Sequence, residues 1–390
     1  MSDVPHLRFP EFSGEWNKYT INDLATVVGG GTPDTTVKSY WGGDIQWFTP
    51  SEIGKNKYVD FSKRTITRDG LDNSSAKLLP LHTILLSSRA TVGECSIASN
   101  ECTTNQGFQS LIAKQCNIDF LYYLIQTKKK DLIRNACGST FLEISANEIR
   151  KIKVAVPVQN EQEQIAKLLS LIDERIATQN KIIEDLKKLK SAIIDYAINS
   201  LDTDFAKFGS LYETAGEGGT PTTSNASFYD NGKIPFVKID DLKQKYLTEN
   251  KDFITELGLQ KSSAWLVPTR SILFSNGATI GEITITTYPV CTKQGILGIV
   301  PKSNIDVEFL YYFMSSTYFK KAISRIVTEG TMKTAYLKDI ANILCPIPTK
   351  EKQQGIAKMP SALNSKIDYE QSLLKLFIMQ KQYLLRQMFI

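Results

Sequence analysis

The side chains of this sequence that could do chemistry are basic, hydroxyl and amide groups gathered on predicted loops. Residues 32–41 and 51–68 combine Lys, Arg, Thr, Ser and Asn with aromatic residues. Lys, Arg, Ser and Thr bind phosphates, whereas Arg, Lys, Asn and Gln read base edges. Any one of these residues could lie on an ordinary solvated loop, but together they indicate contacts with a nucleic acid.

Motifs typical of catalysis are sparse. The sequence has no GxxxxGK[ST] phosphate loop, no HExxH and no Asn/Asp-Pro-Pro-Tyr/Phe tetrapeptide of the amino-methyltransferases. No Asp…Glu-x-Lys cluster stands out as a nuclease metal site, and the run Gly29–Gly31 fits a flexible turn better than a nucleotide site. His6 and His82 are the only histidines, so imidazole acid–base chemistry is not expected. The six cysteines form no CxxC pair and are expected to be free, buried or half-buried thiols.

The sequence repeats itself at an interval of about 190 residues. LPLHTILLSSRATVGE at residues 79–94 returns as VPTRSILFSNGATIGE at residues 267–282, and the interval drifts from 188 to 191 along the chain. An interval of this length indicates a duplicated domain, because solenoid repeats are far shorter. His82 aligns with Arg270, and two copies that have drifted apart suit one task performed on two different targets.

Each copy begins with a part that mixes short strands and short helices. The predicted buried strands pair across turns at Gly93 and Gly281, and they cover residues 83–86, 94–98, 271–274 and 282–286. Residues 120–126 and 309–314 predict core helices, with Asp119 and Asp306 near their N-termini, where a cap or a favourable interaction with the helix dipole would stabilise them. This pattern predicts an α+β fold and not a doubly wound sheet.

A long helical pattern follows each copy, after Pro157 and Pro348. In the first, apolar residues recur every 3.5 positions over about five heptads, which favours a coiled coil. Its a-type positions are Ile165, Ile172, Gln179, Leu186 and Ile193, its d-type positions are Leu168, Arg175, Ile182, Leu189 and Tyr196, and Leu169, Ile176 and Ile183 widen the stripe. The second stripe consists of Ile356, Met359, Leu363, Ile367, Leu373, Leu374, Phe377 and Leu384. Pro360 is expected to kink or restart this helix near its first turn.

The two long helices are expected to pack on each other as an antiparallel coiled coil, although each could instead lie on its own globule. The antiparallel arrangement separates the two globules along a rod and relates them by a pseudo-two-fold axis. The predicted segments are residues 1–158 for the first globule, 159–200 for the first helix, 201–348 for the second globule and 349–390 for the second helix.

Bulk properties set further limits. The net charge of +5 is too small for a global field, so any anion-binding face must be a local cluster. No apolar run is long enough for a membrane span, and the N-terminus does not have the pattern of a signal peptide. The expected location is therefore the cytoplasm, without a membrane partner.

The order of these motifs resembles the specificity (S) subunit of type I restriction–modification enzymes over the whole chain. The resemblance is carried by two Gly-Thr-Pro loops at 31–33 and 219–221, by ILLSSRATVGECSI and ILFSNGATIGEITI, by TNQG and TKQG, and by FLYY twice. The joints VPVQNEQEQIAKLL and IPTKEKQQGIAKM, and the opening LRFPEFSGEW, also fit.

The resemblance implies that each globule is a target recognition domain that reads one half of a split, asymmetric site in double-stranded DNA. The helical pair would set the gap and dock two methyltransferase (M) subunits, and two restriction or motor (R) subunits could join the assembly. The chain itself would be non-catalytic, with S-adenosylmethionine, ATP and Mg confined to the partner subunits. Two alternatives are a nuclease or methyltransferase in its own right, and a coiled-coil scaffold without a nucleic-acid role.

Residues that read bases are expected where the two copies differ, and residues that the copies share are expected to build the fold or to bind phosphate. Thr32 and Thr220 belong to the shared group. The predicted DNA-binding residues of the first copy are Thr32, Lys38, Lys55, Lys57, Lys63, Arg64, Arg68, Ser88, Arg89 and Asn105. Those of the second copy are Thr220, Lys238, Lys243, Lys245, Lys261, Arg270, Asn276 and Lys293.

Overall fold

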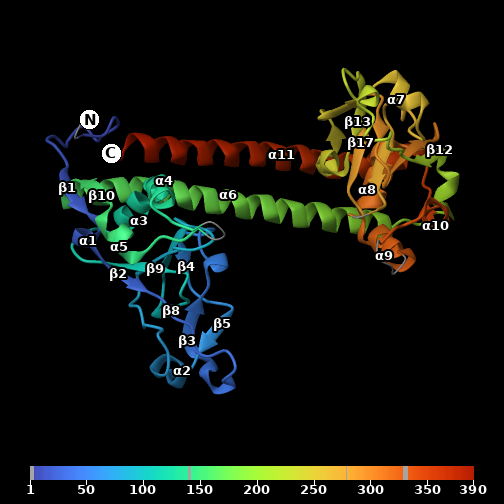
Figure 1. Ribbon diagram of the computed structural model, residues 1–390. Coiled ribbons are helices and arrows are strands. Elements are labelled where there is room, and N and C mark those ends of the chain that lie inside the picture. The colour runs from blue at the N-terminus through green and yellow to red at the C-terminus, as the bar shows by residue number, and fades with distance from the viewer. Residues whose placement is uncertain (1–3, 139–141, 278, 328–332) are drawn as a thin grey trace. The chain divides into compact units, whose positions relative to one another are not determined.

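The computed structural model describes residues 4–138, 142–277, 279–327 and 333–390. The chain forms two compact units, one made of Met1–Asn180 with Ser372–Ile390 and the other of Lys181–Gln371. Each unit contains one globule of strands and short helices together with part of both long helices (Figure 1). None of the described helices is both long and apolar enough to cross a membrane.

Unit 1 contains a mixed sheet, two smaller sheets and short helices. Its strands are β1 (Asn17–Thr20), β2 (Ala25–Gly29), β3 (Trp41–Phe48), β4 (Tyr58–Val59), β5 (Arg64–Ile66), β6 (Ile84–Leu86), β7 (Cys95–Ala98), β8 (Cys102–Thr104), β9 (Gln109–Ala113) and β10 (Lys153–Val156). Its short α-helices are α1 (Ile21–Leu24), α2 (Arg68–Asp72), α3 (Ile118–Thr127), α4 (Lys129–Arg134) and α5 (Ala146–Lys151), and 3-10 turns lie at Lys38–Tyr40 and Pro50–Glu52.

Unit 2 repeats this inventory closely. Its strands are β11 (Phe205–Lys207), β12 (Tyr212–Glu217), β13 (Ile234–Val237), β14 (Tyr246–Leu247), β15 (Asp252–Ile254), β16 (Ile272–Ser275), β17 (Ile283–Thr286), β18 (Cys291–Thr292), β19 (Ile296–Pro301) and β20 (Leu344–Pro346). Its short α-helices are α7 (Glu256–Gln260), α8 (Val307–Ser315), α9 (Thr317–Ile326) and α10 (Leu337–Ile340), and 3-10 turns lie at Phe208–Ser210, Ala226–Phe228 and Ile239–Lys243.

The strand order is the same in both units. Among the described residues, the larger sheets run β2-β9-β6-β7-β4 and β12-β19-β16-β17-β14, and the smaller ones run β5-β3-β8 and β15-β13-β18. The predicted strand pairs are confirmed, because β6 pairs antiparallel with β7 and β16 with β17. Gly93 and Gly281 have φ of +88° and +108°, the left-handed region that favours glycine at the turn. The predicted α+β fold is confirmed.

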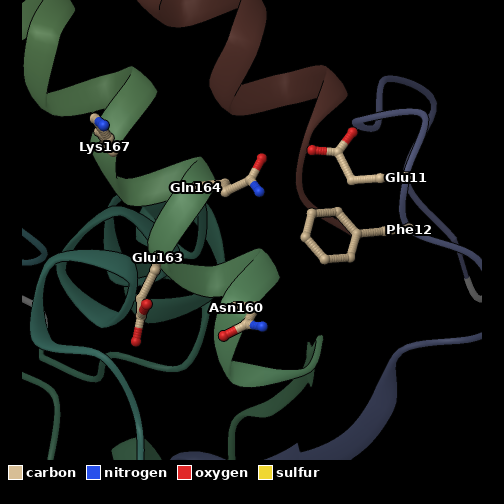
Figure 2. Close-up of a pocket in the computed structure, with 6 residues that line it drawn as sticks. All are labelled: Glu11, Phe12, Asn160, Glu163, Gln164 and Lys167. Carbon is tan, nitrogen blue, oxygen red and sulfur yellow. The ribbon is translucent and has the colours of Figure 1, made fainter.

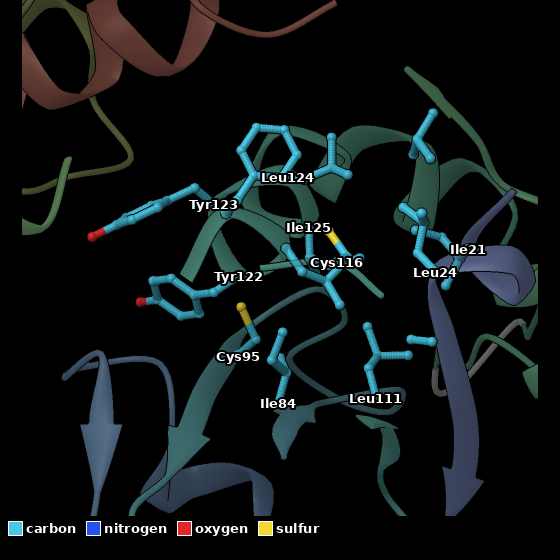
Figure 3. Packing of buried hydrophobic residues seen from close by; sticks show 14 of the residues in the cluster. Ile21, Leu24, Ile84, Cys95, Leu111, Cys116, Tyr122, Tyr123, Leu124 and Ile125 are labelled. Atoms are coloured by element: carbon cyan, nitrogen blue, oxygen red, sulfur yellow. The ribbon is translucent and has the colours of Figure 1, made fainter. Parts of the chain in front are cut away.

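The core of each globule lies between the larger sheet and the predicted FLYY helix. Phe120 and Tyr123 of α3 belong to one buried cluster with Ile84 and Leu111 of the sheet, and Figure 3 shows Tyr122 and Ile125 on the side of this helix that faces the sheet; α8 packs on its sheet in the same way in unit 2. Asp306 caps α8 by accepting hydrogen bonds from Glu308 N and Phe309 N, whereas Asn117 caps α3 and Asp119 lies in its first turn, where its charge suits the helix dipole. The Asp119 carboxylate also forms an ion pair with Lys57.

The long helices are α6 (Gln159–Asn199) and α11 (Lys350–Gln387). Within each unit they run antiparallel. In unit 1 Asp173 pairs with Lys381, and Arg175 lies over the ring of Phe377. Residue numbers therefore increase along α6 in the direction in which they decrease along α11. The restart predicted at Pro360 does not occur, because α11 continues through this residue. Pro360 is buried within the helix, where it cannot donate the backbone hydrogen bond of its position.

The buried face of α6 differs from the predicted seam. The a-type residues Ile165 and Ile172 are buried, but the d-type residues Ile182, Leu189 and Tyr196 are 39%, 48% and 76% exposed. Their place is taken by the residues expected only to widen the stripe, of which Leu169 and Ile183 are fully or almost fully buried. In α11, Met359 is likewise 57% exposed. The helices therefore leave apolar side chains uncovered.

Candidate nucleic-acid interface

Two loops that the sequence singled out meet in each unit. Gly31 N donates to Thr104 O at 2.8 Å, and the Thr32 hydroxyl donates to Gln106 Oε1. In unit 2, Gln294 N donates to the Thr220 hydroxyl at 3.3 Å. The Gly-Thr-Pro loop and the Gln-Gly loop therefore form one surface feature in both globules, and they bring the predicted residues Thr32 and Asn105 close together.

The glycines beside these loops are required by close backbone contact. A Cβ at Gly30 would lie 2.0 Å from Asn105 O, and a Cβ at Gly218 would lie 2.2 Å from Thr292 O. No residue other than glycine fits without displacing the neighbouring strand. The run Gly29–Gly31 is therefore a tightly packed crossing and not the flexible turn that the sequence suggested.

The residues that follow β6 and β16, the central strands of the larger sheets, contact the same surface feature. Ser88 N donates to Gly107 O at 2.8 Å, and Asn276 N donates to Gly295 O at 3.0 Å. The side chains of Ser88 and Asn276 are buried, so neither is open to a ligand in this structure. Arg89 is 42% exposed and donates to Glu143 Oε2 at 2.7 Å and 3.1 Å.

A second group of predicted residues lies on β5 and the neighbouring turns. The guanidinium of Arg64 stacks on the ring of Trp41 at 3.6 Å and lies 5.4 Å from that of Trp47. Stacking of this kind holds a planar cation while its N–H groups stay free to donate. Arg68 nearby pairs with Asp72 at 3.3 Å, and both side chains are mostly exposed.

The corresponding surface of unit 2 has different charges. Arg64 faces Trp47 across the β3–β5 pair, and Asp252 faces Phe236 in the same register of β13 and β15. Asp252 pairs with Lys238 at 2.8 Å, and Lys243 pairs with Asp240 at 3.1 Å. The two globules therefore present opposite charges at one structurally equivalent position.

Several predicted cations are exposed and have no ion pair with any residue that the structure describes. They are Lys38, Lys55, Lys63, Arg64, Lys261, Arg270 and Lys293. Arg270 occupies a turn with φ of +58°, and His82 holds the equivalent turn with φ of +66°. The backbone N–H of Arg270 donates to Thr286 O of β17 at 2.8 Å, and that of His82 donates to Ala98 O of β7 at 2.7 Å. The turn is thus shared by the copies, whereas the side chain that it displays is not.

Two of the predicted cations point inward. The side chain of Lys57 is 9% exposed and that of Lys245 is 3% exposed, and each is held by a carboxylate and a serine hydroxyl. One feature of the sequence could have indicated their burial: the pairs Lys57-Tyr58 and Lys245-Tyr246 are identical inside segments that otherwise differ between the copies. The stacking of Arg64 on Trp41 was also missed, because the two residues are distant in sequence.

Other features fit ligand chemistry poorly. A hollow of about 510 Å³ in unit 1 is lined by Glu11, Phe12, Asn160, Glu163, Gln164 and Lys167 (Figure 2). Its two carboxylates against one ammonium do not suit a phosphate. Within the described ranges, His, Cys, Asp and Glu side chains form no group of three that could hold a metal. Burial raises the pKa of the Cys95 thiol to about 12, which makes it a poor nucleophile, and Cys137 alone among the cysteines is exposed.

Comparison with known proteins finds one family along most of the chain. The family model for the type I restriction modification DNA specificity domain matches twice, at residues 13–188 and 202–376. A type I restriction enzyme specificity subunit, MjaIX of Methanocaldococcus jannaschii, is 30% identical over 383 residues, covering 90% of this chain and 88% of that protein. The EcoR124I/EcoR124II specificity subunit of Escherichia coli is 28% identical over 190 residues, or 47% of this chain and 46% of that protein.

Solved structures show the same fold. The S subunit of a type I restriction–modification system from M. genitalium superimposes with a TM-score of 0.58 at 18% identity, covering 99% of both chains. A chain from a study of complex assembly in the type I system gives a TM-score of 0.62 at 14% identity, covering 95% of this chain and 96% of that chain.

Proposed function

This chain belongs to the family of type I restriction–modification DNA specificity proteins, and we propose that each of its globules reads one half of a split, asymmetric site in double-stranded DNA. One observation carries the proposal. The two units keep the same strand order while the exposed residues at equivalent positions differ in charge, as Arg64 and Asp252 do. One scaffold with two unlike surfaces is suited to two unlike half-sites.

The interface proposed for DNA combines phosphate-binding and base-reading groups. The loops that hold Thr32 and Thr220 are common to both units and suit phosphate contacts. The stacked Arg64 suits a guanine edge, because a guanidinium held in one plane can donate two parallel hydrogen bonds to O6 and N7. Truncation of a base-reading arginine is expected to cost about 1–3 kcal/mol and to relax one position of the site.

The long helices are proposed to set the gap between the half-sites and to dock two methyltransferase subunits. Exposed apolar side chains on these helices support docking, since such surfaces mark partner contacts. They include Ile182, Leu189 and Tyr196 on α6 and Leu376, Met379 and Tyr383 on α11. Up to two restriction or motor subunits complete the proposed assembly. S-adenosylmethionine, ATP and Mg are assigned to these partners, and this chain is proposed to catalyse no step itself.

Co-expression with the neighbouring methyltransferase, in a host without adenine modification, tests the proposal. Sequencing that maps N6-methyladenine across the host genome is expected to return one split motif with a fixed gap. An equal number of residues added to each long helix should change the gap and leave both half-sites intact. Methylation or cleavage by the chain alone would favour an enzyme, and no salt-dependent DNA binding in the presence of the methyltransferase would favour a scaffold.

A further inference from the structure

A buried lysine joins the first globule to the long helix that follows it. Lys57 Nζ lies 2.7 Å from Asp119 Oδ1 at the start of α3 and donates to Ser170 Oγ of α6 at 2.6 Å. The Tyr58 hydroxyl donates to the same carboxylate at 2.9 Å. The ammonium also lies 4.9 Å from the ring centre of Tyr123, a distance at which the ring attracts a cation.

The second globule repeats this arrangement residue by residue. Lys245 Nζ lies 2.8 Å from Glu308 Oε2 at the start of α8 and donates to Ser361 Oγ of α11 at 2.9 Å. The Tyr246 hydroxyl donates to Glu308, and the Tyr312 ring lies 4.8 Å from the ammonium. Each lysine therefore binds a serine on the long helix that comes directly after its own globule.

Within each unit a polar contact also joins the two long helices, and in unit 1 it is continuous with the network of Lys57. In unit 1, Tyr123 OH donates to Asp173 Oδ2 at 2.7 Å, and Asp173 Oδ1 lies 2.7 Å from Lys381 Nζ of α11. In unit 2, Lys190 Nζ of α6 donates to Asn364 Oδ1 of α11 at 2.9 Å. Asp173 and Asn364, like Lys190 and Lys381, are separated by the same interval of 191 residues, so the junction between helices is duplicated as well.

The cost of burying an ammonium indicates that Lys57 and Lys245 orient the globule on the long helix more than they stabilise the fold. A buried ammonium is costly unless it is paired and hydrogen-bonded, and apolar side chains of similar volume often hold two elements together more strongly. Apolar packing, however, tolerates small sliding, whereas an ammonium with a carboxylate on one element and a hydroxyl on another fixes direction and register. The two copies carry opposite charges at the equivalent positions of Arg64 and Asp252, yet both contain the buried lysine with its carboxylate and its serine.

We propose that Lys57 and Lys245 are positioning residues that fix the orientation of each globule on its long helices, so that the gap between the two DNA half-sites depends on them. Neither ammonium touches DNA in this scheme, although both lysines have the type and spacing of DNA contacts in the sequence. The proposal rests on the proposed function, because it concerns the gap that the two readers impose.

Ser170→Ala and Ser361→Ala test the link at its mildest point. Each variant removes the hydroxyl on the long helix and leaves the ion pair of the lysine intact, so folding is expected to survive. In the methylation map, sites whose gap is one base pair longer or shorter should gain methylation at least about tenfold over wild type, because Ser170→Ala loses one hydrogen bond to a charged group and Ser361→Ala loses two, to Lys245 and Glu308. The bases of both half-sites should stay unchanged. Ser191→Ala, at an exposed serine of α6, is the matched control and should leave the gap as it is.

Variants of the lysine separate positioning from contact. Lys57→Met keeps the apolar stem and removes the charge, so it should widen the accepted gap more than Ser170→Ala does. Lys57→Arg, which can still pair with Asp119, should restore part of the fixed gap. Lys245→Met and Lys245→Arg should behave alike in the second globule. If the methionine variants do not accumulate as folded protein, the serine variants decide.

The outcomes are separable. A wild-type map without a split motif would overturn the proposed function and this inference with it. A split wild-type motif whose gap stays fixed in Ser170→Ala and Ser361→Ala would overturn the inference alone. Loss of specific bases from one half-site in Lys57→Arg, with the gap unchanged, would show that the lysine reads DNA directly.

Discussion

The two units agree where the backbone is crowded and disagree where it faces solvent. Gly30 and Gly218 leave no room for a side chain, and the strand order around them is the same. On the outside, Arg68 begins α2 in unit 1, whereas Glu256 begins α7 in unit 2. The comparison shows that the fold depends on a few close contacts and a shared core, which leaves the exposed residues free to specify different targets.

The helix junctions show an intermediate degree of divergence. Unit 1 joins α6 to α11 through the ion pair of Asp173 and Lys381, whose side chains are 17% and 19% exposed. Unit 2 uses a lysine and an amide, Lys190 and Asn364, and burial lowers the pKa of Lys190. The contact is kept in both units, but its charge balance is not, so the two junctions should respond differently to the same change.

The largest effect is expected for an added methyl group at the crowded glycines. Gly30→Ala and Gly218→Ala should each lower the free energy of unfolding of their own unit by at least about 2 kcal/mol, because the new Cβ meets backbone that cannot move freely. Hydrogen–deuterium exchange should show lost protection in β2 and β9 for the first variant, and in β12 and β19 for the second.

Gly355→Ala is the control for both glycine variants. Its Cβ would have nothing within 4 Å, and alanine in a helix is favoured over glycine by about 1 kcal/mol. Protection should therefore stay the same or rise in α11. Unequal effects of Gly30→Ala and Gly218→Ala would show that the two scaffolds are less alike than their strand order indicates.

The helix junctions should give the next largest difference. Asp173→Ala leaves Lys381 half-buried without its carboxylate and Tyr123 without its acceptor, so a loss of about 2–3 kcal/mol is expected in unit 1. Asn364→Ala removes only a neutral acceptor from Lys190, and about 1 kcal/mol is expected in unit 2. Exchange protection of α6 in each variant measures both losses, and equal losses would mean that the charge at Asp173 adds nothing.

The sequence predicted the elements of this fold better than their contacts. The repeat, the strand pairs and the core position of Phe120 follow from local patterns, and all were confirmed. The buried face of α6 was misassigned because the apolar residues form two adjacent stripes, and only the partner helix decides that Leu169 is covered while Tyr196 is not. Lys57 was assigned to the surface by its charge, since its partners Asp119 and Ser170 are brought together only by the tertiary fold.

Acidification should affect the second lysine network over a definite range of pH. Burial alone would raise the pKa of Glu308, but hydrogen bonds from Lys245, Ser361 and Tyr246 lower it from 4.5 to about 2. A carboxyl whose pKa is lowered by folding stabilises the protein at every pH above the pKa that it has in the unfolded chain. This contribution is lost as the pH falls from 4.5 towards 2. Glu308→Gln should flatten the dependence of unit 2 stability on pH in this range.

Thermal unfolding followed at several pH values measures this effect. Glu213→Gln, at an exposed carboxyl of the same unit, should leave the dependence as it is in the wild type. An unchanged slope in Glu308→Gln would mean that the network around Lys245 does not depend on the charge of Glu308.

The smallest effect on stability is expected at the surface pairs, and this makes them the clearest reporters of DNA contact. Arg68 and Asp72 are 71% and 57% exposed, and Lys243 and Asp240 are 69% and 87% exposed, so loss of either pair should change stability by less than about 0.5 kcal/mol. Any loss of affinity in Arg68→Ala or Lys243→Ala must then come from DNA. A phosphate contact would weaken binding to all sequences alike and reduce the salt dependence by about one ion, whereas a base contact would relax one position of one half-site. If neither variant alters affinity, the contacts with DNA lie elsewhere on the proposed interface, and Arg64, whose position is held by Asp252 in unit 2, is the next side chain to test.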